Sequence, residues 1–219
     1  MIKNYTPLTR NQIAERVAQD IFDGAYVNLG IGLPTSVANY LGSDKEVFLH
    51  SENGLLGMGP SPAKGEEDPD LINAGKEMVT LLPGGSYFHL GDSFTMMRGG
   101  HIDICVLGAF QIAENGDLAN WHTGEPDAIP AVGGAMDLAI GAKNVWVATN
   151  HTTRDGTAKI VKECSYPLTG IGCVDRIYTD LAVIDVKDGK LHVTEMFGGI
   201  TFAELEALTD APLVDRTAK

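Results

Sequence analysis

Apolar residues near the start of the chain recur at the spacing of one helical face. Ile13, Val17 and Ile21 stand four residues apart, so about one turn of helix separates each from the next. Thr9 precedes them, and a glutamine follows it three residues later, which is the spacing of a capping box. The pattern predicts a helix that begins after Thr9 and ends at Gly24, because glycine favours helix termination.

Short apolar runs and glycine turns then replace the helical spacing. Residues 26–29 predict a strand, residues 30–32 a glycine turn, and Pro34 the first turn of a helix that reaches Tyr40. A strand, a glycine turn and a helix in succession predict an α/β fold. Further strands are expected at 46–49, 79–82, 102–107, 145–149 and 180–186.

Turn and cap signals organise the second half of the chain. Asn-Gly at 115–116 and Asp-Gly at 188–189 predict tight hairpins. Thr201, with a glutamate three residues later, predicts a capped helix that ends near Leu208. Residues 212–219 follow that helix and are expected to form a frayed tail.

Length and composition indicate one globular unit. The 219 residues are 44% apolar and have a mean hydropathy near zero, which excludes a disordered chain. A chain of this length buries a sizeable core. We therefore expect one domain over residues 1–219, with peripheral tails at 1–8 and 212–219.

Charge and cysteine content narrow the partners and the compartment. A net charge of −13 argues against nucleic acid or an anionic membrane as a partner, and it means that any polyanion site needs local cations or helix N-termini. Cys105, Cys164 and Cys173 lack C-x-x-C spacing and predict free thiols. No signal region opens the chain, and no window approaches the ~20 apolar residues of a membrane span. We expect a cytoplasmic protein.

Glu52 is the leading candidate for a reactive group. The run at 46–49 delivers this single carboxylate into residues 50–60, which carry three glycines and a proline. Glycines let backbone amides approach a ligand closely, so an ionisable group beside them indicates a nucleophile or base. The alternative is that Glu52 caps the following turn while the glycines only supply positive φ angles.

The S-E-N-G sequence at 51–54 resembles the signature of the family I coenzyme A transferases, in the beta half that carries the catalytic glutamate. Other segments resemble landmarks of that family, in the same order, and together cover roughly residues 10 to 200. The resemblance implies a mixed, largely parallel sheet flanked by helices, a fold shared with sugar-phosphate isomerases. The landmarks lie at 30–34, 70–76, 97–101, 116–121 and 133–138.

The resemblance implies covalent catalysis by Glu52. Its carboxylate attacks the acyl carbonyl of a thioester, and the resulting anhydride is converted to a glutamyl-coenzyme A thioester in a ping-pong cycle. A carboxylate is ionised at neutral pH, so no general base is needed. The anhydride must be kept dry, and the apolar residues at 55–58 are expected to contribute. Coenzyme A is then a substrate, and no tightly bound cofactor is expected.

The residues around Glu52 receive supporting roles. The resemblance implies that a backbone N–H of Gly133 or Gly134 stabilises the oxyanion; the alternative is an ordinary glycine turn that enters a helix. Asn53 either fixes the loop, which we favour, or donates to an oxyanion, and Gly54 is a further candidate for substrate contact. His50 is expected to be a hydrogen-bonded structural histidine rather than a substrate contact.

Other binding candidates come from the family landmarks. Gly30 and Gly32 resemble half of a dinucleotide fingerprint, but the third glycine is absent, so we expect them to line the active site instead. Lys76 and Arg98 either meet a carboxylate or phosphate or lie solvated on the surface. His122 is a candidate partner for a second substrate carboxylate. The six histidines show no metal-ligand spacing, so no metal site is expected.

The preferred substrate follows from the same resemblance. It is greatest to beta subunits of enzymes that transfer coenzyme A from succinyl-CoA to 3-oxoadipate in the breakdown of aromatic compounds. Acetoacetate-type relatives carry Pro-Gly-Lys where residues 125–130 stand here. Open alternatives are an acetoacetate, short-chain 3-oxoacid or acetate transferase, a non-catalytic subunit, an acyl-CoA hydrolase and, more remotely, a sugar-phosphate isomerase. The matching segments are 26–28, 47–50, 60–63, 121–124 and 166–174.

The chain holds only the glutamate-bearing half of the fused relatives. The resemblance therefore implies a complex with an alpha subunit, expected to be α2β2, with the site at the interface of the two polypeptides and no activity for this chain alone. The polar segment 61–69 follows the active loop and is either a flap over the site or, as we favour, a solvated surface loop.

Overall fold

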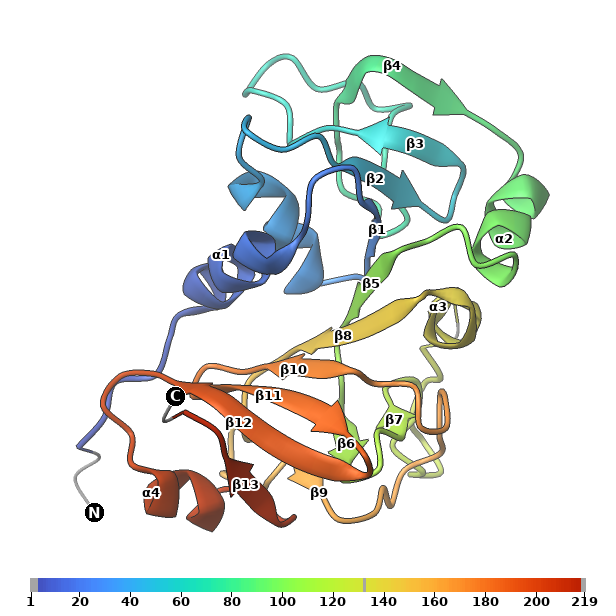
Figure 1. Ribbon diagram of the computed structural model, residues 1–219. Coiled ribbons are helices and arrows are strands. Elements are labelled where there is room, and N and C mark those ends of the chain that lie inside the picture. Colours follow the sequence, from blue (N-terminus) through green and yellow to red (C-terminus); the bar gives the residue numbers. More distant parts are fainter. Residues whose placement is uncertain (1–3, 132, 218–219) are drawn as a thin grey trace.

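A ten-stranded mixed sheet forms the centre of the molecule (Figure 1). The structure is a computed structural model that describes residues 4–131 and 133–217. The strand order is β13-β12-β11-β10-β8-β5-β1-β2-β3-β4, and a separate small sheet has the order β7-β6-β9. The expected mixed, largely parallel α/β sheet flanked by helices is confirmed. None of the helices within the described ranges is both long and apolar enough to cross a membrane.

Five adjacent parallel strands form the middle of the large sheet. They run in the order β10, β8, β5, β1, β2, and antiparallel strands extend the sheet at β11 and β12 and at β3 and β4. Four of the five predicted strands overlap these elements. The parallel strands are β1 (Tyr26–Leu29), β2 (Phe48–Ser51), β5 (Ile104–Leu107), β8 (Asn144–Ala148) and β10 (Arg176–Tyr178).

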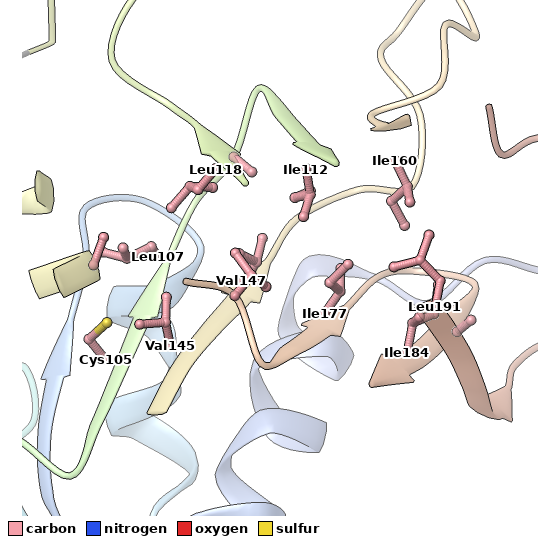
Figure 2. Close-up of a cluster of buried hydrophobic side chains, with 14 of the residues drawn as sticks. Cys105, Leu107, Ile112, Leu118, Val145, Val147, Ile160, Ile177, Ile184 and Leu191 are labelled. Atoms are coloured by element: carbon pink, nitrogen blue, oxygen red, sulfur yellow. The ribbon is translucent and has the colours of Figure 1, made fainter. Parts of the chain in front are cut away.

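The central strands are apolar throughout because both faces of the sheet are covered. In β5, Ile104 and Val106 enter one core cluster, whereas Cys105 and Leu107 enter the other. The first cluster also holds the buried face of α1, and the second packs against the small sheet, as Figure 2 shows. The small sheet comprises β6 (Gln111–Ala113), β7 (Leu118–Ala119) and β9 (Ile160–Val161).

The first two helices follow the sequence pattern with two differences. Helix α1 (Arg10–Asp20) has the predicted capping box at Thr9, but it ends before Gly24, which lies in the turn to β1 with a φ of +79°. Ile21 leaves the helix in an extended conformation and is still buried in the core. The segment that Pro34 begins is a 3₁₀ helix, η1 (Pro34–Tyr40), and no side chain caps its N-terminus.

The chain around Glu52 is more regular than a loop. Strand β3 (Leu55–Met58) returns antiparallel to β2, because the side chains of Leu55 and Met58 are buried in the core. The strand expected at 79–82 begins later, as β4 (Leu81–Tyr87), and its proline is tolerated at the edge of the sheet. Helix α2 (Leu90–Arg98) then leads to β5, and α3 (Ala135–Gly141) leads to β8.

The C-terminal half confirms the turn and cap predictions. Residues 115–116 join β6 to β7, and residues 188–189 join β11 (Ala182–Lys187) to β12 (Lys190–Met196). Asp188 and Gly189 have φ angles of +54° and +65°, as the favoured two-residue hairpin requires. Helix α4 (Phe202–Ala207) has its capping box at Thr201. The three cysteines are free, as expected.

The prediction of a frayed C-terminal tail is wrong for residues 213–215. Strand β13 (Leu213–Asp215) pairs in parallel with β12, and Leu213 packs against the buried core. The backbone N–H of Arg216 donates to Val193 O at 2.9 Å. At the other end, Thr6 N–H donates to Gly198 O at 2.9 Å, so the expected tail at 1–8 is also held. The remaining tail positions, 1–3 and 218–219, lie outside the described residues.

A buried histidine makes the fold sensitive to acid. His151 follows β8 and has no exposed surface, and its ring nitrogens hydrogen-bond Thr179 Oγ1 at 3.1 Å and Thr209 Oγ1 at 2.9 Å. Burial lowers its pKa from 6.5 to about 4, although the charge of Asp180 opposes the shift. The unfolded chain therefore binds the proton first as the pH falls, and stability is lost between about pH 6.5 and 4.

We expect His151→Gln to reduce this loss. The free energy of unfolding, measured by urea titration at pH 7, 5.5 and 4.5, should fall less steeply with acidification in the variant than in the unsubstituted chain. His101→Gln, at an exposed position, is the matched control and should keep the original slope. Equal slopes for His151→Gln and the unsubstituted chain would contradict the assignment.

Candidate active site

A cleft of about 540 Å³ lies at the carboxyl ends of the central parallel strands. The chain leaves β1 through η1 toward β2 on one side, whereas β5 is followed by β8 on the other side, so strand order reverses between β1 and β5. Ligands of α/β proteins bind at such a switch point. The lining includes residues after each of these strands, namely 30–34, Glu52, 107–110 and 148–150, together with Gly133 and Gly134.

Glu52 stands in the tight turn between β2 and β3. The turn needs glycine at position 54, because its φ is +118° and a Cβ there would collide with Phe88 O. Gly54 therefore shapes the turn and does not line the cleft. The side chain of Asn53 donates to Ile72 O at 2.7 Å, which fits the expected structural role.

The N-terminus of α3 lies against the carboxylate. Gly134 caps this helix, and a Cβ at Gly134 would lie 3.4 Å from Glu52 Cγ and 3.7 Å from its Oε1. Gly133 lines the same cleft. The first amides of a helix have no partners within the helix. The structure thus brings together the three residues that the sequence selected for the reaction, across more than 80 positions of chain.

The second glycine pair closes the floor of the cleft. Gly30 lies so close to β5 that a Cβ would be 3.0 Å from Val106 O, and Gly32 has a φ of +95°. Thr35 Oγ1 donates to Gly30 O at 3.1 Å and fixes the turn. Both glycines line the cleft, as expected.

A buried polar group behind Glu52 was missed by the sequence reasoning. Asn28, in β1, has no exposed surface, and its Nδ2 lies 3.2 Å from Glu52 Oε2 and 3.0 Å from His50 Nδ1. His50 is buried as well, and its Nε2 lies 2.9 Å from Ser93 Oγ. Burial lowers the pKa of His50 to about 4, so the ring is neutral near pH 7. A polar residue in the middle of an apolar strand was the available signal.

Three predicted binding residues do not line the cleft. Lys76 is exposed in a turn where its φ is +63°. Arg98 Nε forms an ion pair with Asp137 Oδ1 at 2.6 Å, and its side chain is 67% exposed. His122 accepts from Gly124 N–H at 2.9 Å, within its own loop. Local partners or solvent satisfy each of these side chains. Segment 61–69 is largely exposed and contributes no residue to the lining.

The cleft contains two other cations instead. Arg10 lines it from the first turn of α1, and Lys159 enters from the other side. Lys159 Nζ donates to Ala109 O at 3.1 Å and to Thr149 Oγ1 at 2.8 Å. Burial lowers the pKa of Lys159, the charge of Asp180 opposes this shift and the charge of Arg10 adds to it. Two like charges at one cleft indicate an anionic ligand.

The apolar lining also differs from the expectation. Leu55 and Met58 belong to the core and do not reach the cleft, whereas Leu33, Leu107 and Phe110 line it. Their side chains surround the carboxylate region with apolar surface. Within the described residues, no group of three or more histidine, cysteine, aspartate or glutamate side chains is placed to hold a metal ion.

Comparison with known proteins agrees with the motif-based resemblance. Two chains named as the B-type polypeptide of 3-oxoadipate CoA-transferase are 69% and 67% identical, from Acinetobacter baylyi over 98% of this chain and 99% of that one, and from Pseudomonas putida over 94% and 97%. The B-type polypeptide of a probable succinyl-CoA:3-ketoacid coenzyme A transferase from Bacillus subtilis is 49% identical over 92% of this chain and 93% of that one.

Solved structures support the fold. An acyl-CoA transferase apoenzyme from Escherichia coli O157:H7 superposes with a TM-score of 0.74 at 20% identity, over 96% of this chain and 42% of that longer chain. Glutaconate coenzyme A-transferase from Acidaminococcus fermentans has a TM-score of 0.67 at 16% identity, over 98% and 91%. The family model described as coenzyme A transferase matches residues 10–206, most of the sequence. This chain therefore belongs to the coenzyme A transferase family.

Proposed function

We propose that this chain is the glutamate-bearing subunit of an enzyme that moves coenzyme A from succinyl-CoA to 3-oxoadipate. The single observation that carries the chemistry is the position of the Glu52 carboxylate, which faces the cleft with the N-terminus of α3 beside it. The substrate is supported by relatives named for 3-oxoadipate that are 67–69% identical over nearly the full length of both chains.

The reaction begins with attack by Glu52 on the succinyl carbonyl. The C–S bond breaks, coenzyme A leaves as the thiolate, and a succinyl-glutamyl anhydride remains. The thiolate then adds to the glutamyl carbonyl, and succinate leaves. The acceptor acid reverses these steps on the glutamyl thioester. Each transfer exchanges one acyl bond for another, so no oxidant, metal or added proton is required.

The surroundings of Glu52 suit these intermediates. Backbone N–H groups of Gly133 and Gly134 are the candidates for stabilising the negative charge of the tetrahedral intermediates, and loss of one such donor typically costs about 10²–10³ in rate. Leu107 and Phe110 limit access of water to the anhydride. Arg10 and Lys159 give an otherwise acidic chain local positive charge where its anionic substrates bind.

The complete enzyme contains a partner polypeptide in this proposal. The similar relatives are named as one of two types of polypeptide, the B-type, which implies a partner of the other type. Within the cleft lining of this chain, Ile31 leaves 69% of its surface exposed and Phe110 38%. Apolar side chains at the open rim of a cleft fit coverage by another protein surface. We place the site at the interface with the alpha subunit of an α2β2 complex, which also explains a single domain of this length.

Trapping the covalent intermediate tests the nucleophile. The chain assembled with its alpha subunit, incubated with succinyl-CoA and then treated with borohydride, should carry an alcohol in place of the side-chain carboxyl of residue 52, as read from peptide mass. Glu52→Gln should abolish both the modification and turnover, because an amide cannot form the anhydride. Glu52→Asp should lose on the order of 10²-fold, because the shorter side chain withdraws the carboxylate by ~1 Å.

Two controls make that result specific. Glu77→Gln changes an exposed carboxylate outside the cleft lining and should leave labelling and turnover unchanged. Full activity of assembled Glu52→Gln would indicate that this chain is non-catalytic in the complex, and it would overturn the proposal.

Comparison of acceptors tests the substrate. With succinyl-CoA as donor, the assembled enzyme should use 3-oxoadipate with a kcat/KM at least tenfold above that for acetoacetate, and the isolated chain should not turn over. Release of free thiol in the absence of acceptor, at the rate of transfer, would indicate a hydrolase instead. A preference for acetoacetate would move the assignment to the 3-ketoacid enzymes, to which a 49% identical relative belongs by name.

A further inference from the structure

The amide of Asn28 is surrounded by more acceptors than it has hydrogens. Its Nδ2 lies 3.2 Å from Glu52 Oε2, 3.0 Å from His50 Nδ1 and 3.3 Å from His50 O. Its Oδ1 is buried and has no hydrogen-bond partner within the described part of the chain. An unpaired buried oxygen is costly, so this arrangement persists only if the amide nitrogen is needed where it lies.

The neighbours of Asn28 fix the orientation of its amide. A neutral His50 presents an unprotonated Nδ1 to Asn28, so its Nε2 carries the hydrogen and donates to Ser93 Oγ at 2.9 Å. If the amide were turned over, Oδ1 would face Glu52 Oε2 and His50 O, and three acceptors would repel one another. His50 and Ser93 are fully enclosed, so water cannot replace either contact.

The two oxygens of Glu52 are therefore not equivalent. Oε2 accepts the hydrogen bond from Asn28, whereas Oε1 accepts none within the described residues and lies near the N-terminus of α3. Glu52 lines the cleft, so Oε1 is the oxygen left free to attack a substrate. A neutral donor on Oε2 orients the carboxylate without the strong charge neutralisation that a paired cation would cause.

On the basis of the proposed function, we propose that Asn28 is a catalytic residue that donates to Glu52 Oε2 throughout the reaction, and that His50 and Ser93 position it. Oε1 attacks the acyl carbonyl and the acyl C–S bond breaks. The coenzyme A thiolate then adds to Glu52 Cδ, and the C=O electron pair moves onto Oε2, which lies within reach of Asn28. The C=O bond re-forms as Cδ–Oε1 breaks, and the donor acid leaves with Oε1.

This role differs from that of the glycine amides at 133–134. Those groups belong to the carbonyl of the bound acyl group, whereas Asn28 serves the carbonyl of the enzyme's own glutamyl group. Both half-reactions pass through a tetrahedral centre at Cδ, so loss of Asn28 should slow the conversion of anhydride to thioester in each direction. Removing one preorganised donor from an oxyanion typically lowers the rate about 10²–10³-fold.

Asn28→Ala in the assembled enzyme tests the donor. We expect kcat to fall about 10²–10³-fold while the KM for succinyl-CoA changes less than threefold, with borohydride labelling still at residue 52 but slower in a quenched time course. Asn144→Ala is the matched control, because its amide donates to Asp103 O at 3.0 Å at the opposite end of the sheet. It should keep the original kcat.

Asn28→Asp provides a readout that a purely structural role would not move. The near-isosteric change places a second carboxylate beside Oε2, and like charges at this distance cannot both ionise freely. The acid limb of the kcat profile should shift to higher pH by one unit or more. The other charged groups that line the cleft, Arg10 and Lys159, are unchanged in this variant, and neutral His50 lies behind position 28.

His50 and Ser93 are tested through their coupling to Asn28. Ser93→Ala should lower kcat about tenfold in the original background and less than threefold in the Asn28→Ala background, because it acts only through the amide. Equal losses in both backgrounds, or an assembled Asn28→Ala enzyme with kcat within threefold of the original, would overturn the inference. Failure to label residue 52 in the unsubstituted enzyme would instead overturn the proposed function.

Discussion

The contact between Gly30 and β5 is the interaction on which the site depends. Gly30 N–H donates to Val106 O at 2.8 Å, and no side chain fits between the two strands there. This bond holds β1 against β5 up to the point where their connections diverge to opposite sides of the sheet. The divergence opens the cleft, and the parallel register between β1 and β2 then sets Asn28 opposite His50, two residues before Glu52.

A polar network inside an apolar sheet follows from that placement. Asn28, His50 and Ser93 lie among residues that would otherwise form continuous core, and burial of unpaired polar groups there costs free energy. Each hydrogen bond in the network offsets part of that cost. Asn28 Oδ1 remains unpaired, so the network is not optimal for stability. Such departures are expected where a group is held for chemistry rather than for packing.

Local signals in the sequence predicted the elements well, and distance in the chain limited the rest. The box at Thr9, the hairpin at 188–189 and the apolar strands depend on neighbouring residues, so they were found. Glu52 was found because its turn carries a family signature. Arg10 and Lys159 were missed because only the fold brings them to one cleft. Arg98 was selected for closeness to a motif, yet an ion pair with Asp137 holds it elsewhere.

Strand order also separates the nucleophile from the cations. Glu52 follows β2, whereas Lys159 is held by residues after β5 and β8, with β1 between them. Two strand spacings amount to about 10 Å, a distance at which a cation attracts an anionic substrate without forming an ion pair with the carboxylate. A direct pair would orient Glu52 but draw charge from the attacking oxygen. The neutral amide of Asn28 orients it without that loss, so the arrangement of strands reconciles binding of anions with nucleophilic attack by an anion.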